Sequence, residues 1–289
     1  MPISVTEIMK VQKSTELGKQ LKQQGAFDEA IKQFNVALRL NPDNLGVLNQ
    51  LAAIYARSKN WEEAVNCYRQ IIALRPKNAK AYLQLATALQ NQNKLYGAVA
   101  ALQEAMEIDP NAFKARDYKQ YGDILDRLNS QKGQNAQAEE AIAAHQKAVE
   151  LDPSLPANFH IKLGDALQRQ KRYEEAITSY QNAFLVKPDL GETAYLKLGK
   201  AKINKGDIDQ AIGSYKKALE LNSKYVPTYT ALADVSRQKG LLDDAVAYYR
   251  KAIDLQPQAP ALYRLMGNVL TQQGRTAEAT EYYRKAESI

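Results

Sequence analysis

The residue types in this chain that could support chemistry are two histidines, a single cysteine and several pairs of neighbouring glutamates. Nucleophilic catalysis would need a cysteine or serine beside a histidine base, and metal binding would need several clustered ligands. His145, His160 and Cys67 do not make up a usual metal set, and no specific catalytic motif surrounds them. No G-x-G-x-x-G or Walker-type loop is present to cradle a phosphate. The sequence therefore gives no indication of an enzyme, of a metal site or of a bound cofactor.

The glutamate pairs could act as acid and base, but their recurrence favours a structural role. The pairs are Glu62–Glu63, Glu139–Glu140 and Glu174–Glu175. Each one precedes an apolar stripe with helical spacing, and acidic side chains stabilise the positive end of a helix dipole. We therefore interpret these pairs as helix starts.

The elements that must position these residues form an internal repeat. Similar helix-ending segments recur along the chain, among them ALRLNPDN, AMEIDPNA and AIDLQPQA. An alanine in a matching context precedes each segment and recurs once more near the end: Ala30, Ala64, Ala98, Ala141, Ala176, Ala211, Ala245 and Ala279. The intervals between these alanines are 34, 34, 43, 35, 35, 34 and 34 residues. The pattern predicts eight repeats, of which the fourth is lengthened.

The repeat closely resembles the tetratricopeptide repeat family, whose pattern covers 34 residues. The fifth repeat carries that pattern in its bulky, small and proline positions: His160, Leu163, Gly164, Leu167, Ala176, Tyr180, Ala183 and Pro188. The resemblance extends over residues 11–289. It implies an all-α, right-handed superhelical solenoid of antiparallel helix pairs, which we expect to form a single domain over 1–289. The expected repeats are 11–44, 45–78, 79–112, 113–156, 157–191, 192–225, 226–259 and 260–289.

The spacing supports the same arrangement on physical grounds. Repeat positions 4, 7, 8 and 11 form one helical stripe, and positions 20, 24 and 27 form another. Small residues at positions 8, 20 and 27 let the two helices approach closely. Glycine at position 15 suits a left-handed turn between the helices, as at Gly25, Gly206, Gly240 and Gly274. A lone helix pair cannot bury its stripe, so the pairs must stack.

Most aromatic residues fall on this framework. Thirteen of the seventeen tyrosines do so: Tyr55, Tyr68, Tyr82, Tyr118, Tyr121, Tyr173, Tyr180, Tyr195, Tyr215, Tyr229, Tyr249, Tyr263 and Tyr283. His145 and His160 occupy positions 24 and 4, where other repeats carry mostly aromatic or apolar residues. We predict core packing for these residues, and a packed or partly exposed thiol at Cys67.

The basic charge gathers on one stripe of the first helices. The net charge is +7, and in the family the first helix of each repeat lines the concave surface. Positions 2, 5, 6, 9, 12 and 13 of each repeat make up what we call the first-helix stripe. Its basic residues are Lys19, Lys22, Arg57, Lys80, Arg116, Lys119, Arg127, Lys162, Arg169, Lys197, Lys200, Arg237 and Arg264. Its acidic residues are Glu16, Asp123, Asp126, Asp165 and Asp234.

This stripe predicts a non-catalytic scaffold that binds an acidic, extended or helical peptide of a partner protein in a basic groove. A solvated surface with a chance charge bias is the alternative. The family's clamp for chaperone carboxylates is poorly matched, because only Lys80 agrees among the first three repeats. RNA binding is disfavoured, since the tyrosines are committed to packing. A further alternative is a regulatory or substrate-docking segment of a larger enzyme such as a glycosyltransferase.

The remaining features concern the ends and the compartment. With one cysteine and no apolar run of signal-peptide or membrane-spanning length, we expect a cytoplasmic protein without an intramolecular disulfide. Ser4 and Glu7 predict a capping box for a helix from about Val5 to Gln24. The sequence given ends within the second helix of the last repeat. We expect its uncovered face to pair with another copy, a neighbouring domain or a further segment.

The fourth repeat carries nine extra residues. Two of them, Phe113 and Lys114, precede the repeat, and seven lie between its helices near 129–137. The segment NSQKGQNAQ is almost wholly polar and predicts a surface loop, with an extra turn of helix after Leu128 as the alternative. A tolerated insertion without a function is the favoured interpretation.

Overall fold

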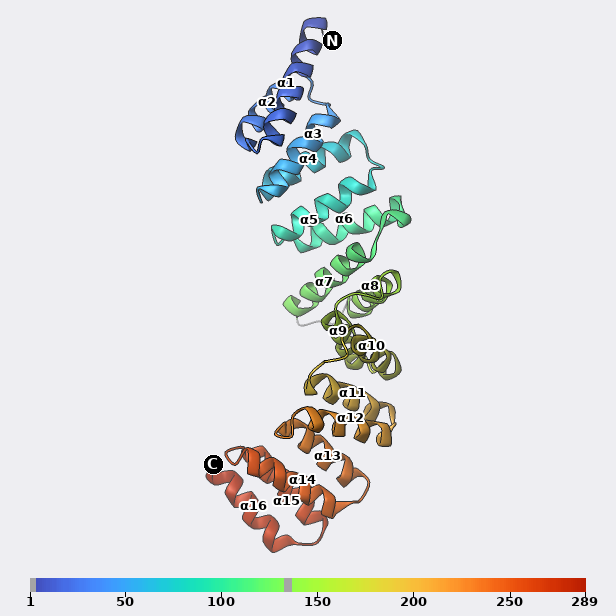
Figure 1. Ribbon diagram of the computed structural model, residues 1–289, viewed down its shortest axis with the longest axis vertical. Helices are drawn as coiled ribbons and strands as arrows, with labels where there is room; N and C mark the ends of the chain where they lie inside the picture. Colours follow the sequence, from blue (N-terminus) through green and yellow to red (C-terminus); the bar gives the residue numbers. More distant parts are fainter. Residues whose placement is uncertain (1–3, 133–136) are drawn as a thin grey trace. The chain divides into compact units, whose positions relative to one another are not determined.

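The computed structural model describes residues 4–132 and 137–289, and every regular element within these ranges is helical. The chain divides into two compact bodies, Met1–Asp152 and Pro153–Ile289. In each body a first helix pairs with the second helix that follows it, and neighbouring pairs stack (Figure 1). The predicted all-α arrangement of stacked antiparallel helix pairs is confirmed.

The N-terminal body contains four helix pairs. Its elements are α1 (Val5–Gln23), α2 (Phe27–Leu40), α3 (Leu45–Arg57), α4 (Trp61–Leu74), α5 (Ala79–Asn91), α6 (Leu95–Ile108), η1 (Pro110–Ala112), α7 (Ala115–Lys132) and α8 (Ala138–Leu151). The capping box at the start of α1 is present, since Ser4 Oγ accepts from Glu7 N and Glu7 Oε2 accepts from Ser4 N.

The C-terminal body also contains four pairs. Its helices are α9 (Ala157–Arg169), α10 (Tyr173–Val186), α11 (Glu192–Lys205), α12 (Ile208–Leu221), α13 (Val226–Gln238), α14 (Leu242–Leu255), α15 (Pro260–Gln272) and α16 (Thr276–Ser288). The glutamate pairs lie in the first turns of α4, α8 and α10, as predicted for helix starts. Within the two described stretches of chain, no helix combines the length and apolar character needed to cross a membrane.

The two helices of a pair meet where a ring lies against a glycine. A Cβ atom added to Gly164 of α9 would lie 2.7 Å from the Tyr180 ring of α10. The same contact would be 2.5 Å between Gly122 and His145, well below ordinary van der Waals separation. At Gly164 and Gly122 an alanine would therefore force the facing ring to shift, whereas the second and seventh repeats combine Tyr68 with Ala52 and Tyr249 with Ala233.

The turns within the pairs follow the predicted left-handed geometry, with an addition. Gly206 has a φ of 100°, and Gly25, Gly240 and Gly274 are also left-handed. Lys59, Asn93 and Lys171 adopt φ values of 58° to 60° at the same repeat position. The left-handed turn is therefore kept at these positions, although a residue with a side chain pays roughly 1 kcal/mol for the left-handed conformation.

Six of the thirteen framework tyrosines are buried as predicted, and the other seven are partly buried. Tyr180, Tyr215 and Tyr249 are fully buried, and His145 and His160 are 5% and 0% exposed. Cys67 packs in the same core as Tyr68, and burial raises the pKa of its thiol to about 11. This thiol is protonated at neutral pH, which makes it a poor nucleophile.

The fourth pair carries the extra residues in two places. Helix α7 has 18 residues whereas α3 and α5 have 13, so the alternative of an extra turn after Leu128 is present. The middle of the predicted loop, 133–136, lies outside the described residues. Before α7, Phe113 is buried and packs edge-on against Tyr118 at 5.0 Å between ring centroids.

Candidate functional site

The first-helix stripe of the N-terminal body has polar contacts from one helix to the next. Seven of the predicted basic residues belong to it: Lys19, Lys22, Arg57, Lys80, Arg116, Lys119 and Arg127. Lys22 Nζ of α1 donates to Gln50 Oε1 of α3 at 2.7 Å. Gln120 Nε2 of α7 donates to Gln90 Oε1 of α5 at 2.7 Å. Stripe residues of successive first helices therefore lie side by side.

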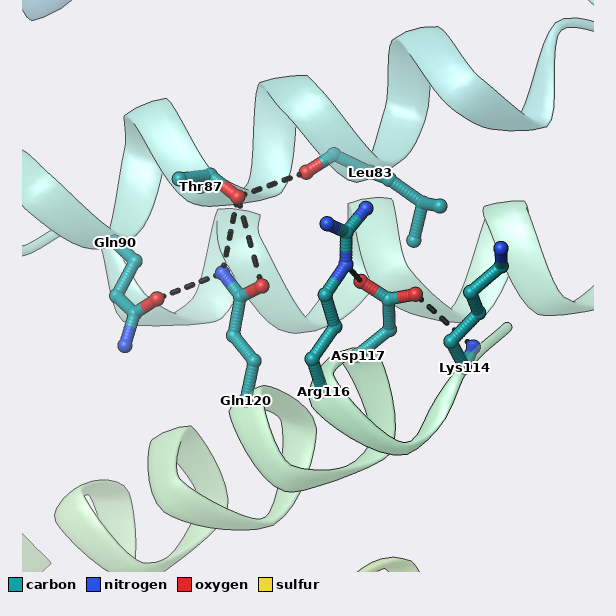
Figure 2. A network of polar contacts seen from close by, with 7 residues as sticks. All are labelled: Leu83, Thr87, Gln90, Lys114, Arg116, Asp117 and Gln120. Atoms are coloured by element: carbon teal, nitrogen blue, oxygen red, sulfur yellow. Dashed lines mark hydrogen bonds and ion pairs between the residues drawn. The ribbon is translucent and has the colours of Figure 1, made fainter. Parts of the chain in front are cut away.

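The best-defined part of this surface lies between α5 and α7 (Figure 2). Figure 2 shows Gln120 reaching across to both Thr87 and Gln90. On the same side of α7, Arg116 Nε lies 3.3 Å from Asp117 Oδ1, and the Arg116 side chain is 82% exposed. The amide contacts thus hold two helices together beside a guanidinium that faces solvent.

The carboxylates of the N-terminal stripe all lie beside cationic or hydrogen-bonding groups. Asp126 Oδ2 lies 3.1 Å from Nε2 of the buried His145. Asp123 accepts from Lys119 Nζ at 2.7 Å, and Glu16 pairs with Lys19 at 3.4 Å. These acids are therefore engaged by residues of the protein itself.

The C-terminal body repeats this arrangement with a different chemistry. Asp165 accepts a hydrogen bond from the Tyr180 hydroxyl at 2.7 Å and pairs with Lys197. Asp234 accepts from the Tyr249 hydroxyl at 2.6 Å. Burial, together with the hydrogen bond to the carboxylate, raises the pKa of both tyrosines well above the ordinary value. In these two repeats, the framework tyrosine is buried in the core and its hydroxyl also donates a hydrogen bond to an acidic residue of the stripe.

The basic residues of the stripe divide into engaged and free groups. In the C-terminal body they are Lys162, Arg169, Lys197, Lys200, Arg237 and Arg264. Lys162, Lys200 and Arg264 are exposed, and within the part of the chain that the structure describes they form no ion pair. The same holds for Lys80 in the N-terminal body. Six basic against two acidic residues leave this C-terminal stripe with a net charge of +4, and seven against three give the N-terminal stripe the same value.

A pocket of about 310 Å³ opens on the C-terminal stripe, and the sequence did not predict it. The residues that line it come from α13, α15 and α16: Arg237, Leu265, Asn268, Thr271, Gln272 and Tyr283. The Tyr283 hydroxyl donates to Asn268 Oδ1 at 2.9 Å, so the amide nitrogen of Asn268 remains a donor. Among the residues that line this pocket, Arg237 carries a positive charge and none carries a carboxylate. In the sequence, the polar residues Asn268, Thr271 and Gln272 at stripe positions 9, 12 and 13 of the eighth repeat could have indicated this pocket.

The histidines and the cysteine do not come together. His145 packs against Gly122, while Nε2 of His160 lies 3.3 Å from the carbonyl oxygen of Pro153. Across residues 4–132 and 137–289, no group of three or more histidine, cysteine, aspartate or glutamate side chains could hold a metal ion.

Models of the tetratricopeptide repeat match the sequence along most of its length. The matched residues are 131–191, 196–260 and 230–289, together with 18–59, 54–93 and 79–112. The chain belongs to the tetratricopeptide repeat family. The resemblance inferred from the repeated alanines and aromatic residues is therefore confirmed.

Curated relatives share parts of this tetratricopeptide chain. An Hsp70-Hsp90 organising protein of Plasmodium falciparum is 28% identical over 145 residues, which are 50% of this chain and 54% of the relative. The Peroxisomal targeting signal receptor of Saccharomyces cerevisiae is 37% identical over 65 residues, or 22% of this chain and 11% of the receptor. The chain thus spans about half of the first relative's length and a smaller share of the second.

Solved tetratricopeptide structures support the fold. The C-terminal part of a TPR repeat-containing protein from Cytophaga hutchinsonii superposes with a TM-score of 0.57 at 19% identity, covering 83% of this chain and 94% of that one. YrrB, a TPR protein with an unusual peptide-binding site, gives 0.54 at 18% identity and covers 68% and 96%. At these identities the likeness concerns the fold alone.

Proposed function

We propose that this tetratricopeptide protein is a non-catalytic scaffold whose first-helix stripe binds an acidic segment of a partner protein. The observation that carries the proposal is the unequal state of the charges on the stripe. Asp165 and Asp234 accept hydrogen bonds from Tyr180 and Tyr249, whereas exposed cations such as Lys162 form no ion pair with any residue that the structure describes. With six basic and two acidic residues, the C-terminal stripe keeps a net positive charge, which attracts negative charge and repels positive charge.

The polar pocket on the C-terminal stripe adds a place for specificity. Arg237 and the amide of Asn268 line it, and both offer hydrogen-bond donors. A carboxylate that enters would meet charge-assisted hydrogen bonds, which are stronger than neutral ones. The pocket therefore favours an acidic segment that inserts one side chain into it, and this side chain fixes the position of the segment on the stripe.

The names of the relatives agree with partner binding. One is named as an organiser of Hsp70 and Hsp90, and another as a receptor for a peroxisomal targeting signal. Both names describe proteins that associate with other proteins. The kind of partner proposed for this chain rests on its own charges.

The test is a charge reversal confined to the free cations. The probe is a fluorescein-labelled decapeptide of alternating glutamate and serine, titrated with the full chain at low and at physiological salt. Lys162→Glu, Lys200→Glu and Arg264→Glu together should weaken binding at least about tenfold, since three exposed charges change sign.

The matched control reverses Lys216, Lys217 and Lys251, which are exposed on the second helices α12 and α14. The control should retain most of the affinity. Equal losses in the two triple variants would refute the stripe as the binding surface. Undiminished binding by the stripe variant would do the same.

A further inference from the structure

The N-terminal body holds a cavity of about 660 Å³ outside the first-helix stripe, lined by residues of α6, α7 and α8. It lies at the junction between the third and fourth repeats, where the chain carries η1 and the two extra residues Phe113 and Lys114. Small side chains at Ala100, Ala143 and Ala144 leave the space unfilled. The edge-on contact with Phe113 positions the ring of Tyr118 at the cavity. The irregular repeat junction and the cavity therefore coincide.

The charges around this cavity have one sign. Glu104, Glu107 and Glu140 line it, and none of its lining residues is basic. Glu104 and Glu107 are exposed, and within the described chain neither forms an ion pair. On a protein with an overall charge of +7, this is a local surface of opposite sign.

The third glutamate, Glu140, accepts a hydrogen bond from Tyr121, which itself accepts one from Gln103. Gln103 Nε2 donates to the Tyr121 hydroxyl at 2.9 Å, and that hydroxyl donates to Glu140. Burial, followed by the hydrogen bond to Glu140, raises the pKa of Tyr121, so its hydroxyl stays protonated. The second oxygen of the Glu140 carboxylate remains an acceptor.

The lysine of α8 that follows the cavity in the sequence is engaged elsewhere. Lys147 of α8 follows the lining residues Ala143 and Ala144, but its Nζ lies 2.8 and 2.9 Å from the two carboxylate oxygens of Glu150. That bidentate contact commits Lys147 to Glu150. The carboxylates of Glu104 and Glu107 are left for a ligand from outside the chain.

The shape and lining of the cavity select the kind of cation. Over the described residues, no group of three or more carboxylate, histidine or cysteine side chains could hold a metal ion. The carboxylates are instead combined with apolar and aromatic surface from Met106, Tyr118 and the alanines. An arginine side chain fits that combination, because its aliphatic stem packs on apolar surface and its planar guanidinium stacks on aromatic rings and pairs with carboxylates.

We propose that the cavity between α6 and α8 binds an arginine side chain presented by a basic segment of a partner protein. The proposal is independent of the function assigned to the first-helix stripe, because the two surfaces attract opposite charges. One protein could then hold an acidic and a basic segment at once.

The experiment uses the full chain and a fluorescein-labelled peptide with three arginines separated by glycine and serine. Two matched peptides replace arginine with lysine or with neutral citrulline. Fluorescence anisotropy should rank affinity as arginine, then lysine, then citrulline. Glu104→Gln with Glu107→Gln should weaken arginine binding about fivefold, as expected for two exposed charge contacts.

Two further variants separate the cavity from general electrostatics. Glu62→Gln with Glu63→Gln removes another exposed acidic pair, on α4, and should leave binding unchanged. Tyr118→Leu should narrow the preference for arginine over lysine, because it removes the aromatic face. Citrulline binding equal to that of arginine would overturn the proposal. Equal losses in the two glutamate variants, or none in the Glu104 and Glu107 variant, would overturn it as well.

Discussion

The hydroxyl of Tyr180 on α10 donates a hydrogen bond to Oδ1 of Asp165 on α9 at 2.7 Å. The ring of Tyr180 packs against Gly164, so the same side chain closes the helix pair and reaches the charged stripe. Tyr249 and Asp234 repeat the relationship in α14 and α13. Core packing and surface charge are therefore coupled through a single residue in each of these repeats.

Buried phenols make the stability of the protein sensitive to alkaline pH. Burial, reinforced by the bonded carboxylate, raises the pKa of Tyr180 and Tyr249 above the ordinary value of 10.0. The unfolded chain loses these protons at lower pH than the folded one, so their contribution is complete below pH 10 and falls as pH rises further. Urea unfolding from pH 8 to 11 should show a decline that starts near pH 10.

A second variant assigns that decline to the buried rings. Tyr180→Phe should make it shallower, whereas Tyr96→Phe, which alters an exposed ring, should not. An unchanged profile in Tyr180→Phe would contradict the coupling.

The glycine at position 8 can be tested against another helical glycine. Gly164→Ala would place a Cβ atom 2.7 Å from the Tyr180 ring, so the free energy of unfolding should fall by about 1–3 kcal/mol. Gly213→Ala in α12 meets nothing within 4 Å and should raise it by about 0.5–1 kcal/mol through helix propensity. Chemical denaturation of both variants measures the contrast. Similar changes in the free energy of unfolding for the two variants would show that contact with the Tyr180 ring does not set the requirement for glycine at position 164.

The sequence predicted this part of the fold because packing imposes a spacing. A ring at position 24 faces a small residue at position 8, glycine in five repeats, as in Tyr180 with Gly164, and alanine in two, as in Tyr249 with Ala233. This periodicity is visible without coordinates. The helix pairs, the burial of His145 and His160, and the capping box followed from the same local rules.

Other features depended on three-dimensional placement. The sequence counted Lys197 and Lys162 as equal members of the stripe, but only Lys197 reaches Asp165. That difference is set by the register of α11 against α9, which spacing alone does not encode. The cavity beside Tyr118 was missed for the same reason, because it follows from how the irregular fourth repeat packs on the third.

The left-handed turns were predicted only where glycine marks them. Lys171 has a φ of 60° at the same position, which a side chain adopts at a cost. Lys171→Gly should therefore stabilise the protein by a few tenths to about 1 kcal/mol, net of the extra entropy of the unfolded glycine. Lys171→Ala retains a Cβ and should give no such gain. Thermal unfolding of both variants distinguishes relief of strain from loss of charge.

The coupling between Tyr180 and Asp165 also predicts an effect on binding, which rests on the function proposed for the stripe. Asp165→Asn removes a negative charge and releases Lys197 from its ion pair, while the amide oxygen can still accept from the Tyr180 hydroxyl. Affinity for the glutamate–serine decapeptide should rise about threefold, the gain coming from one exposed charge. Asp189→Asn, at an exposed site outside the stripe, should leave affinity unchanged. Unaltered or weaker binding by the Asp165 variant would mean that bound acidic segments do not contact Lys197.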